Sequence, residues 1–428
     1  MKKILRFISY ISFFSLLLTQ GQIFSDEKNS LSLKASQEEE FNVALNNLEE
    51  REMEIYEILA RGGYWLYYPA RLAGHSFERV TRPFKYGEVE YEETLTAEIL
   101  QRVSSCFITV IATPTAILTF PVASIFLTTA HLLHSDRLQF EEGEAPSVSG
   151  DFSVLFLNVC LQGGPFSALT GGVSSLHEDF DKCQPSRISA IADFVQSIEG
   201  GPDILCFSEV HDLAAMDELK IKLKEKGYTF FITDIPTHPV CNNSGLFVAS
   251  KVKISNPQFA AYPLKDRSNV HLGAQQGCII FDLEDESAQK VITLASTHLN
   301  YGERDIDHES RKRQLHDHIF ENLSQEDISL LGGDLNYEYF NKMDELQSLA
   351  EDREVASLLD CDVVTTTRES FETGPHIRGK QKPKEVIDAA LLLNDDSQYQ
   401  WDAQTIEPKL GDKFVTDHYG VLVRAQKK

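Results

Sequence analysis

Short apolar runs, each the length of one buried strand, recur from about residue 149 to the C-terminus of this chain. Polar or helix-forming stretches separate the runs, and two of these stretches, 186–197 and 311–322, have the length of a helix. Strands that alternate with helices are typical of an α/β domain built around sheets. The apolar runs are VLFLNV, ILCFSEV, SGLFVAS, CIIFDL, VITLAST, ISLLGGD, VIDAALLL and GVLVRA.

The composition is that of a globular protein with a strong negative charge. The 428 residues include 65 acidic and 40 basic side chains, which gives a formal net charge of -25 at pH 7. This charge repels nucleic acid at long range, so it disfavours a nuclease unless a local basic groove overrides it. The 7 cysteines show no CxxC spacing, which predicts neither a zinc site nor a dense disulfide framework.

The N-terminal residues predict export from the cytoplasm. Residues 1–25 begin with the sequence MKKILRFISYISFFSLLLTQGQ, which has a charged start, an apolar middle and the small residues Thr19 and Gly21. This pattern is typical of a secretory signal peptide, and an uncleaved membrane anchor is the competing interpretation. A bacterial protein of this kind would be periplasmic or secreted. Residues 26–100 are predicted to be mostly helical, since strong helix formers fill residues 31–61.

The hydrophobic segment 101–137 predicts an association with a membrane. It contains an uncharged stretch, Cys106 to Leu133, that is long enough to cross a bilayer, but Pro114 and Pro121 interrupt this stretch. Basic residues precede it and acidic residues follow it, which conflicts with the orientation that a cleaved signal and one full span would give. We therefore predict a re-entrant or surface-lying segment, with a kinked span or a buried hairpin of a soluble protein as alternatives.

Polar residues that bind metals or phosphates stand at the ends of many predicted strands. Asp334 and Asn336, for example, follow a buried run and would either form a turn or lie on the same side of an extended chain. Each residue alone has an ordinary explanation, but a sheet delivers adjacent strand ends to one rim, where loops carry function. Together they predict a site made of Asn158, Glu209, His298, Asp334, Asn336, Asp388, Asp417 and His418.

The order and spacing of these residues resemble the endonuclease/exonuclease/phosphatase superfamily, the DNase-like metal-dependent phosphoesterases. The resemblance covers about residues 150–428, which follow a predicted linker, EEGEAPSVSG, and its most specific elements are GDLN at 333–336 and TDH at 416–418. It implies a four-layer α/β/β/α sandwich as the catalytic domain, here preceded by a helical, partly hydrophobic N-terminal region. It also implies a hydrolytic site at one rim of the sandwich that depends on Mg2+, with Mn2+ as a substitute.

The resemblance further implies a role for each site residue. Magnesium takes oxygen ligands, so one carboxylate, an amide oxygen and the substrate phosphate suffice to hold it. An imidazole beside a carboxylate can act either as a base or as a cation that holds phosphate. Two positions depart from the family pattern, namely Cys160 and the alanines that follow Asp388. By resemblance, the metal ligands are Glu209, Asn158 and Asp417, the phosphate-binding residues are Asn336, His298 and Asn158, and the catalytic residues are His418, Asp388, Asp334 and His298.

Three substrate classes compete, and a phospholipid head group is favoured. The segments SEVHD, NSGLFVAS and SRKRQLHDHI are similar to neutral sphingomyelinases. The motif GDLNY resembles phosphoinositide phosphatases through Tyr337, but Glu338 stands where those enzymes have arginine. Acidity disfavours a nuclease, and retention of the whole residue set disfavours a non-catalytic binding module. We therefore predict an exported, membrane-associated, Mg2+-dependent phosphodiesterase that acts on a phospholipid or other phosphate ester, sphingomyelin first, with the membrane surface as partner and nucleic acid disfavoured.

Overall fold

A computed structural model gives the fold of most of the chain beyond residue 90 and of scattered residues before it. The residues that it describes are 58–59, 62–63, 66–67, 69–70, 73, 91–133, 138–161, 187–211, 213–234, 243–266, 276–302, 304–323, 327–337, 342–351, 353–359, 387–395, 398–410, 413–416 and 418–428. The predicted signal segment and most of the predicted helical region 26–100 therefore lie outside the described residues.

The larger of two main sheets has seven strands. Its order is β1 (Leu138–Glu141), β4 (Phe230–Asp234), β5 (Phe247–Ser250), β3 (Ile204–Val210), β2 (Phe152–Leu161), β15 (Gly420–Lys427) and β12 (Tyr399–Ile406). All neighbours run antiparallel except β2 and β3, which run parallel. The carboxyl ends of β2 and β3 therefore lie at the same edge of this sheet.

The second main sheet has six strands. Its order is β10 (Val355–Ser357), β11 (Asp388–Leu393), β9 (Ile328–Asp334), β8 (Lys290–His298), β7 (Gly277–Asp285) and β6 (Ile254–Ala261). Here β8 and β9 form the parallel pair, and the other neighbours are antiparallel. A separate two-stranded ribbon joins β13 (Lys409–Leu410) to β14 (Lys413–Phe414).

The two main sheets pack face to face across one apolar core. Phe156 and Val423 of the larger sheet share this core with Phe281 and Leu330 of the smaller one. The next residue along β9, Leu331, belongs instead to a second core on the other face of the six-stranded sheet, as alternation along a strand requires. Because both faces are buried, these strands read as continuous apolar runs, which is why the sequence predicted them.

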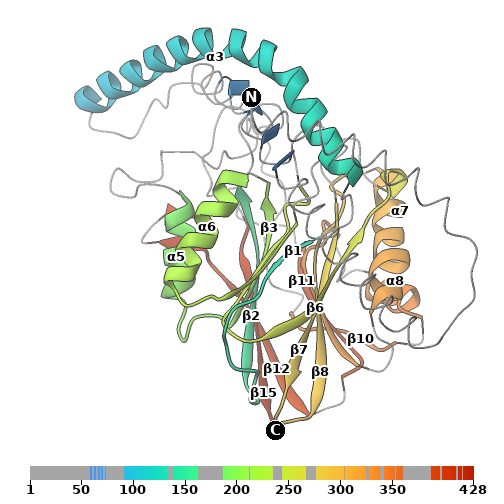
Figure 1. Ribbon diagram of the computed structural model, residues 1–428. Helices are drawn as coiled ribbons and strands as arrows, with labels where there is room; N and C mark the ends of the chain where they lie inside the picture. The colour runs from blue at the N-terminus through green and yellow to red at the C-terminus, as the bar shows by residue number, and fades with distance from the viewer. Residues whose placement is uncertain are drawn as a thin grey trace, which may run out of the picture. The chain divides into compact units, whose positions relative to one another are not determined.

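Helices cover both outer faces. The helices α5 (Arg187–Ser197) and α6 (Leu213–Glu225) lie on the seven-stranded sheet, and α7 (Asp305–Arg313) and α8 (Met343–Leu349) lie on the six-stranded sheet (Figure 1). A π-helical turn, η3 (Gln314–Ile319), and a short 3-10 turn, η4 (Phe320–Asn322), continue α7, and a further 3-10 turn is η1 (Leu264–Asp266). The predicted four-layer α/β/β/α sandwich is confirmed.

The predicted linker at 141–150 is instead part of the sandwich. Strand β1 pairs with β4 along its whole length. The backbone of Lys253 donates to the carbonyl of Pro146 at 2.9 Å, and Val148 bridges to Asp285 in the six-stranded sheet. The sandwich therefore includes β1, which begins at Leu138. The sequence did not reveal this strand, because a short polar strand at a sheet edge carries too little apolar pattern to be recognised.

The hydrophobic segment forms one long helix, α3 (Tyr91–Leu133), which continues through Pro114 and Pro121. The prediction of a re-entrant hairpin is therefore wrong. Figure 1 shows α3 bending along its length, and prolines are the usual cause of such bends because each removes a backbone hydrogen bond. Described residues from an earlier part of the chain pack against it: Tyr67 lies 5.6 Å from Phe120 between ring centroids.

Candidate active site

The register of the six-stranded sheet brings three predicted site residues together. Asp334, the last residue of β9, pairs with His298, the last residue of the parallel strand β8. Asp334 also pairs with Asp388, the first residue of the antiparallel strand β11. Two strand ends and one strand start therefore meet at the same edge of the sheet.

Asp334 lies at the centre of the group and connects the two sheets. Its Oδ2 atom accepts a hydrogen bond from Nδ2 of Asn158, on β2 of the other sheet, at 3.1 Å. The same oxygen lies 3.5 Å from Nε2 of His298 and 3.8 Å from Nε2 of His418. Asn158, His298, Asp334 and His418 are all at least 95% buried, so these polar groups are held together away from bulk water.

His418 and Asp388 form the pair that the resemblance implied. Nδ1 of His418 lies 2.9 Å from Oδ2 of Asp388, and both side chains are buried. The carboxylate fixes the orientation of the ring through Nδ1, which leaves Nε2 on the side of Asp334. The arrangement resembles an acid–base pair in which the carboxylate orients and polarises the imidazole.

Two glycines precede Asp334 because neither position has room for a side chain. A Cβ atom at Gly332 would lie 2.5 Å from the ring of Phe156, which crosses from the other sheet. Gly333 has φ 129°, and a Cβ atom there would lie 2.1 Å from the carbonyl oxygen of Thr297. The GGD sequence thus lets β9 approach both the opposite sheet and β8 closely, which places the Asp334 carboxylate.

Glu209 is presented by an irregularity in the parallel pair β2 and β3. The pairing shifts between Asn158 and Leu161, so that two residues of β2 lie opposite Glu209 alone. Glu209 and Cys160 both adopt left-handed backbone, with φ 61° and 50°. Bulges of this kind re-aim side chains next to active sites, and left-handed non-glycine residues persist where the surroundings impose them.

The Glu209 carboxylate faces the same group. One of its oxygens lies 3.9 Å from Nε2 of His298, and its side chain is 15% exposed. The amide oxygen of Asn158 accepts a hydrogen bond at 3.0 Å from the backbone nitrogen of Cys160, one of the two bulge residues opposite Glu209. Glu209 is thus the more accessible of the site carboxylates.

Asn336 forms a turn and does not continue an extended chain. Its backbone nitrogen donates to Oδ1 of Asp334 at 2.9 Å, and its φ is 48°. Its side-chain nitrogen donates to the carbonyl of Leu299, the residue after His298, at 3.0 Å. The prediction that Asp334 and Asn336 share one side of an extended strand is wrong, because the asparagine folds back within an aspartate-stabilised turn.

The predicted metal ligand Asp417 lies outside the described residues. The sequence-based prediction of the site did not include three residues that the structure places beside it. The hydroxyl of Thr416 donates to the carbonyl of Asn158 at 2.7 Å. His211 is buried two residues after Glu209, and burial holds its pKa below the ordinary value. Arg187 is buried at the start of α5. Proximity to a motif could have found Thr416 and His211, whereas nothing in the sequence distinguishes Arg187.

Two sets of side chains could hold a cation. Glu209 offers a partly exposed carboxylate and Asn158 a buried amide oxygen, and such oxygen ligands suit a hard ion such as Mg2+. Asp334, Asp388 and His418 offer ligand atoms within 4.8 Å of one another. An ion among these three would compete with the His418–Asp388 hydrogen bond, so the chemistry of the donors favours Glu209 and Asn158.

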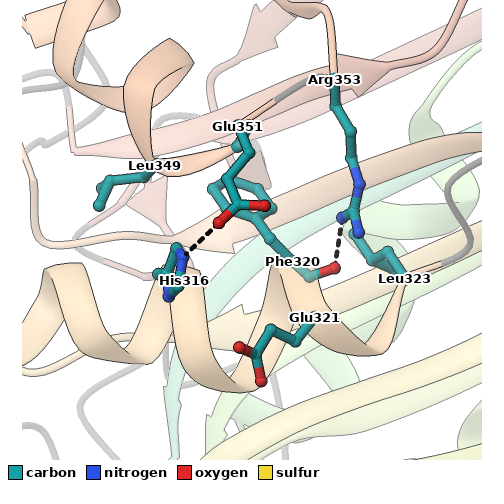
Figure 2. A pocket seen from close by; sticks show the side chains of 8 residues that line it. His316, Phe320, Glu321, Leu323, Leu349, Glu351 and Arg353 are labelled. Carbon is teal, nitrogen blue, oxygen red and sulfur yellow. Dashed lines mark hydrogen bonds and ion pairs between the residues drawn. The ribbon is translucent and has the colours of Figure 1, made fainter.

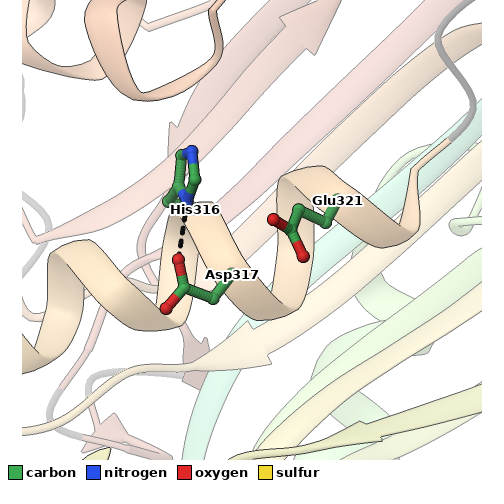
Figure 3. A group of neighbouring side chains, drawn as sticks. All are labelled: His316, Asp317 and Glu321. Carbon is green, nitrogen blue, oxygen red and sulfur yellow. Dashed lines mark hydrogen bonds and ion pairs between the residues drawn. The ribbon is translucent and has the colours of Figure 1, made fainter.

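A second group of titratable side chains lies in the outer helix layer. His316, Asp317 and Glu321 share one stretch of helix (Figure 3), beside a cavity of about 460 Å3 that Glu351 and Arg353 also line (Figure 2). Both ring nitrogens of His316 face carboxylates, Asp317 at 2.6 Å and Glu351 at 3.3 Å. The histidine is thus part of an ion-pair network between η3 and the end of α8.

This network predicts a pH-dependent contribution to stability. The hydrogen bond to Asp317, and then that to Glu351, raise the pKa of His316 above its ordinary value of 6.5. The stabilisation is therefore complete below about pH 6.5 and disappears as pH rises through the higher folded-state pKa. Denaturant unfolding of His316→Gln should show a larger loss at pH 5.5 than at pH 9. A loss that is equal at both pH values would contradict this assignment.

The model of the endonuclease/exonuclease/phosphatase family matches residues 158–372, half of the chain. No curated protein sequence matches.

Among solved structures, the chain is similar to the endonuclease/exonuclease/phosphatase from Beutenbergia cavernae DSM 12333. The two share 18% identity, the match covers 65% of this chain and 72% of that chain, and the TM-score is 0.46. It is similar to a double mutant of beta toxin from Staphylococcus aureus with bound magnesium ions, with 16% identity, 65% and 100% covered and a TM-score of 0.45. It is also similar to sphingomyelinase C from Streptomyces griseocarneus, with 17% identity, 65% and 100% covered and a TM-score of 0.44. With its family match, its two-sheet sandwich and its site at the strand ends, the chain belongs to the endonuclease/exonuclease/phosphatase family.

Proposed function

We propose that this protein is a Mg2+-dependent phosphodiesterase that acts on a phospholipid head group, with sphingomyelin as the first candidate substrate. The observation that carries the proposal is the convergence on Asp334 of the Asn158 amide and two imidazoles, drawn from both sheets. Such a set supplies hydrogen-bond donors for phosphoryl oxygens and a group that can transfer a proton.

Each residue has a chemical role in the proposed reaction. The amide of Asn158 and the ring of His298 would bind phosphoryl oxygens, because both point at the centre of the site. Asn336 would join them from the turn after β9. Asp334 would orient the attacking water or the leaving group. His418, with Nδ1 held by Asp388, would move a proton at Nε2 or hold phosphate as a cation.

The proposed metal ligands are Glu209, Asn158 and Asp417, with Mn2+ as a substitute for Mg2+. The donor chemistry fits, since Glu209 offers a partly exposed carboxylate and Asn158 an amide oxygen. When bound, the ion would neutralise the charge that develops on the phosphoryl oxygens. The buried side chains around Asp334 would position the substrate.

Helix α3 supports a membrane location for the substrate. Among the described residues, Cys106–Ala130 is long and apolar enough to cross a bilayer. Its apolar side chains are exposed at successive positions, such as Val110 (71%) and Ile111 (68%), or Ile117 (68%) and Leu118 (76%). These four residues share one face of the helix, because seven residues make almost two full turns, and the opposite face carries the buried apolar residues Ala112, Ala116 and Ala123. A helix that is apolar on all sides fits a bilayer interior better than the membrane surface.

Four threonine hydroxyls of α3 are also satisfied within the helix. The hydroxyls of Thr113, Thr115, Thr119 and Thr129 donate to carbonyls four residues earlier, at 2.6, 3.4, 3.0 and 2.8 Å. Such bonds let threonine lie in hydrocarbon without an unpaired donor. Since β1 begins at Leu138, shortly after α3 ends at Leu133, an inserted helix would keep the sandwich close to its lipid substrate.

An arginine in the middle of α3 is expected to prevent membrane insertion. Leu118→Arg adds a charge near the centre of the apolar stretch, which costs roughly 2.5 to 3.5 kcal/mol in insertion. Val103→Arg, which lies before this stretch, is the matched control. Carbonate extraction of isolated membranes should release the Leu118→Arg protein and retain the control. Equal retention of both variants would contradict a membrane-spanning role for α3.

A phosphoinositide phosphatase is the second candidate, because basic groups surround the residue after Asn336. The ring of Tyr337 stacks on His308 with centroids 4.9 Å apart, and the Lys342 ammonium lies 4.9 Å from the same ring. Burial and the neighbouring Lys342 lower the pKa of His308, so the Lys342 ammonium is the cation that could bind a further phosphate of an inositol head group. One assay, run with Mg2+ or with chelator, separates the candidates. It measures phosphocholine release from sphingomyelin, phosphate release from phosphoinositides and plasmid nicking in parallel. Nicking alone would overturn the lipid assignment.

A further inference from the structure

Arg187 carries a buried charge that joins two separate parts of the chain. It is the first residue of α5, and its side chain is 99% buried. Its guanidinium donates to the carbonyl of Val159 at 2.9 Å and to that of Val415 at 2.6 Å, and it also contacts the carbonyl of Cys160. Val159 and Cys160 form the bulge of β2, and Val415 lies three residues before His418.

The regular ladder is interrupted where Arg187 binds. Pairing between β2 and β15 extends only from Phe152 to Phe156, and pairing between β2 and β3 shifts after Asn158. Backbone carbonyls buried at such a gap need donors from elsewhere. Arg187 supplies them to Val159, Cys160 and Val415, and the Thr416 hydroxyl supplies one to Asn158 at 2.7 Å. The two side chains replace a backbone ladder between β2 and the segment Val415–Thr416.

The joined segments each carry a group that faces Asp334. Asn158, next to the bulge, donates to Oδ2 of Asp334 at 3.1 Å, and Nε2 of His418 lies 3.8 Å from the same oxygen. We propose that Arg187 is a positioning residue that sets the separation of Asn158 and His418 across Asp334, and thereby the rate of the proposed hydrolysis. This inference rests on the proposed function for its effect on rate, but its geometric part stands on the contacts alone.

Lysine is not expected to replace this arginine. Nη1 of Arg187 donates to both segments, at Val159 and Val415, and Nη2 contacts Cys160, so the rigid planar fork holds three carbonyls in one fixed geometry. A lysine ammonium is a single point on a flexible stem and would not hold these three carbonyls in the same geometry. A displacement of about 1 Å at a reacting group can lower a rate about 100-fold, so a small shift of Asn158 relative to His418 is sufficient.

The first test compares Arg187→Lys with Arg353→Lys in the full-length protein. Arg353 is a matched control, since its side chain is 92% buried and donates to the carbonyl of Phe320 in the outer helix layer (Figure 2). With Mg2+ and bis(p-nitrophenyl) phosphate, Arg187→Lys should lower kcat 10- to 100-fold with KM unchanged, whereas the control should keep its kcat. A kcat that is unchanged in Arg187→Lys, or lowered equally in both variants, would overturn the positioning role.

Two further arms keep the outcome decisive. If Arg187→Lys does not fold, Thr416→Val is tested instead, because it removes only the hydrogen bond from the Thr416 hydroxyl to the carbonyl of Asn158. This variant should lower kcat about tenfold at constant KM. An unchanged kcat would overturn the proposal. If the natural protein does not hydrolyse the probe, the proposed function fails for this substrate, and crystal structures decide the geometric claim. The Asn158–Asp334 distance, now 3.1 Å, should lengthen in Arg187→Lys. An unchanged distance would refute the claim.

Discussion

The His418→Ala variant is expected to hydrolyse the proposed phosphodiester substrate roughly 10²- to 10⁴-fold more slowly than the natural protein. The ring of His418 is the only imidazole among the described residues whose Nδ1 contacts Asp388, and its Nε2 faces Asp334. Alanine removes the group that would transfer the proton or hold the phosphate. The position of the loss in kcat or KM separates these roles, since a cation that binds phosphate contributes to KM as well.

His316→Ala provides the control for this prediction. His316 also contacts a carboxylate through Nδ1, at 2.6 Å, but it lies in the outer helix layer. Its removal should leave kcat and KM unchanged at pH 7. Steady-state kinetics of both variants, with circular dichroism to verify folding, make the comparison. Comparable kinetics for His418→Ala and the natural protein would exclude His418 from the reaction.

The Glu209→Gln variant is expected to lose about 10²- to 10³-fold in kcat and to require more Mg2+ for half-maximal activity. Glutamine keeps the shape of the side chain but removes the charge that would hold the ion. Because only the carboxylate changes, the left-handed backbone at φ 61° should be retained. A Mg2+ titration of activity, with substrate in excess, measures both effects.

Glu351→Gln is a closely matched control for Glu209→Gln. Glu351 also has left-handed backbone, at φ 57°, and its carboxylate lies 3.3 Å from Nε2 of a histidine, His316. It differs in lying outside the site. The control should show the natural activity and Mg2+ dependence. If Glu209→Gln behaves like the control, Glu209 is not a metal ligand, and if activity persists in chelator, no metal is needed.

The layers of the fold could be predicted because the strands of the sandwich are buried on both faces. Runs such as ILCFSEV and ISLLGGD are therefore mostly apolar up to their polar ends, and they form β3 and β9 with the expected bounds. The missed strands lie mostly at sheet edges. β12, at the edge of the larger sheet, alternates buried or half-buried residues with exposed ones, so its apolar pattern is weak.

The site could be predicted where its residues belong to strand-end motifs. His298, Asp334 and Asp388 follow from the sheet register, and the sequence located all three. Arg187 could not be predicted, because its partners lie more than 20 residues away in one direction and more than 200 in the other. A contact of this kind depends on how β2 bulges, and local sequence does not determine that.

The re-entrant hairpin predicted for α3 is wrong for a physical reason, whereas a kink at the prolines, the alternative, agrees with the bend of the helix. Proline within a helix removes one hydrogen bond and bends the chain, but it does not oblige the chain to reverse. The remaining backbone groups are satisfied by continuing the helix. The structure accordingly keeps Pro114 and Pro121 inside a helix of 43 residues.

The central claim is that one rim of the sandwich binds a divalent ion and a phosphoryl group together. Anomalous diffraction from crystals soaked in Mn2+ tests it most directly, because the ion is located without reference to any activity. We expect one Mn2+ site bonded to the Glu209 carboxylate, on the side of Asp334 and Asn158. A Mn2+ ion found only among His316, Asp317 and Glu321, or none near Glu209 at saturating concentration, would contradict it.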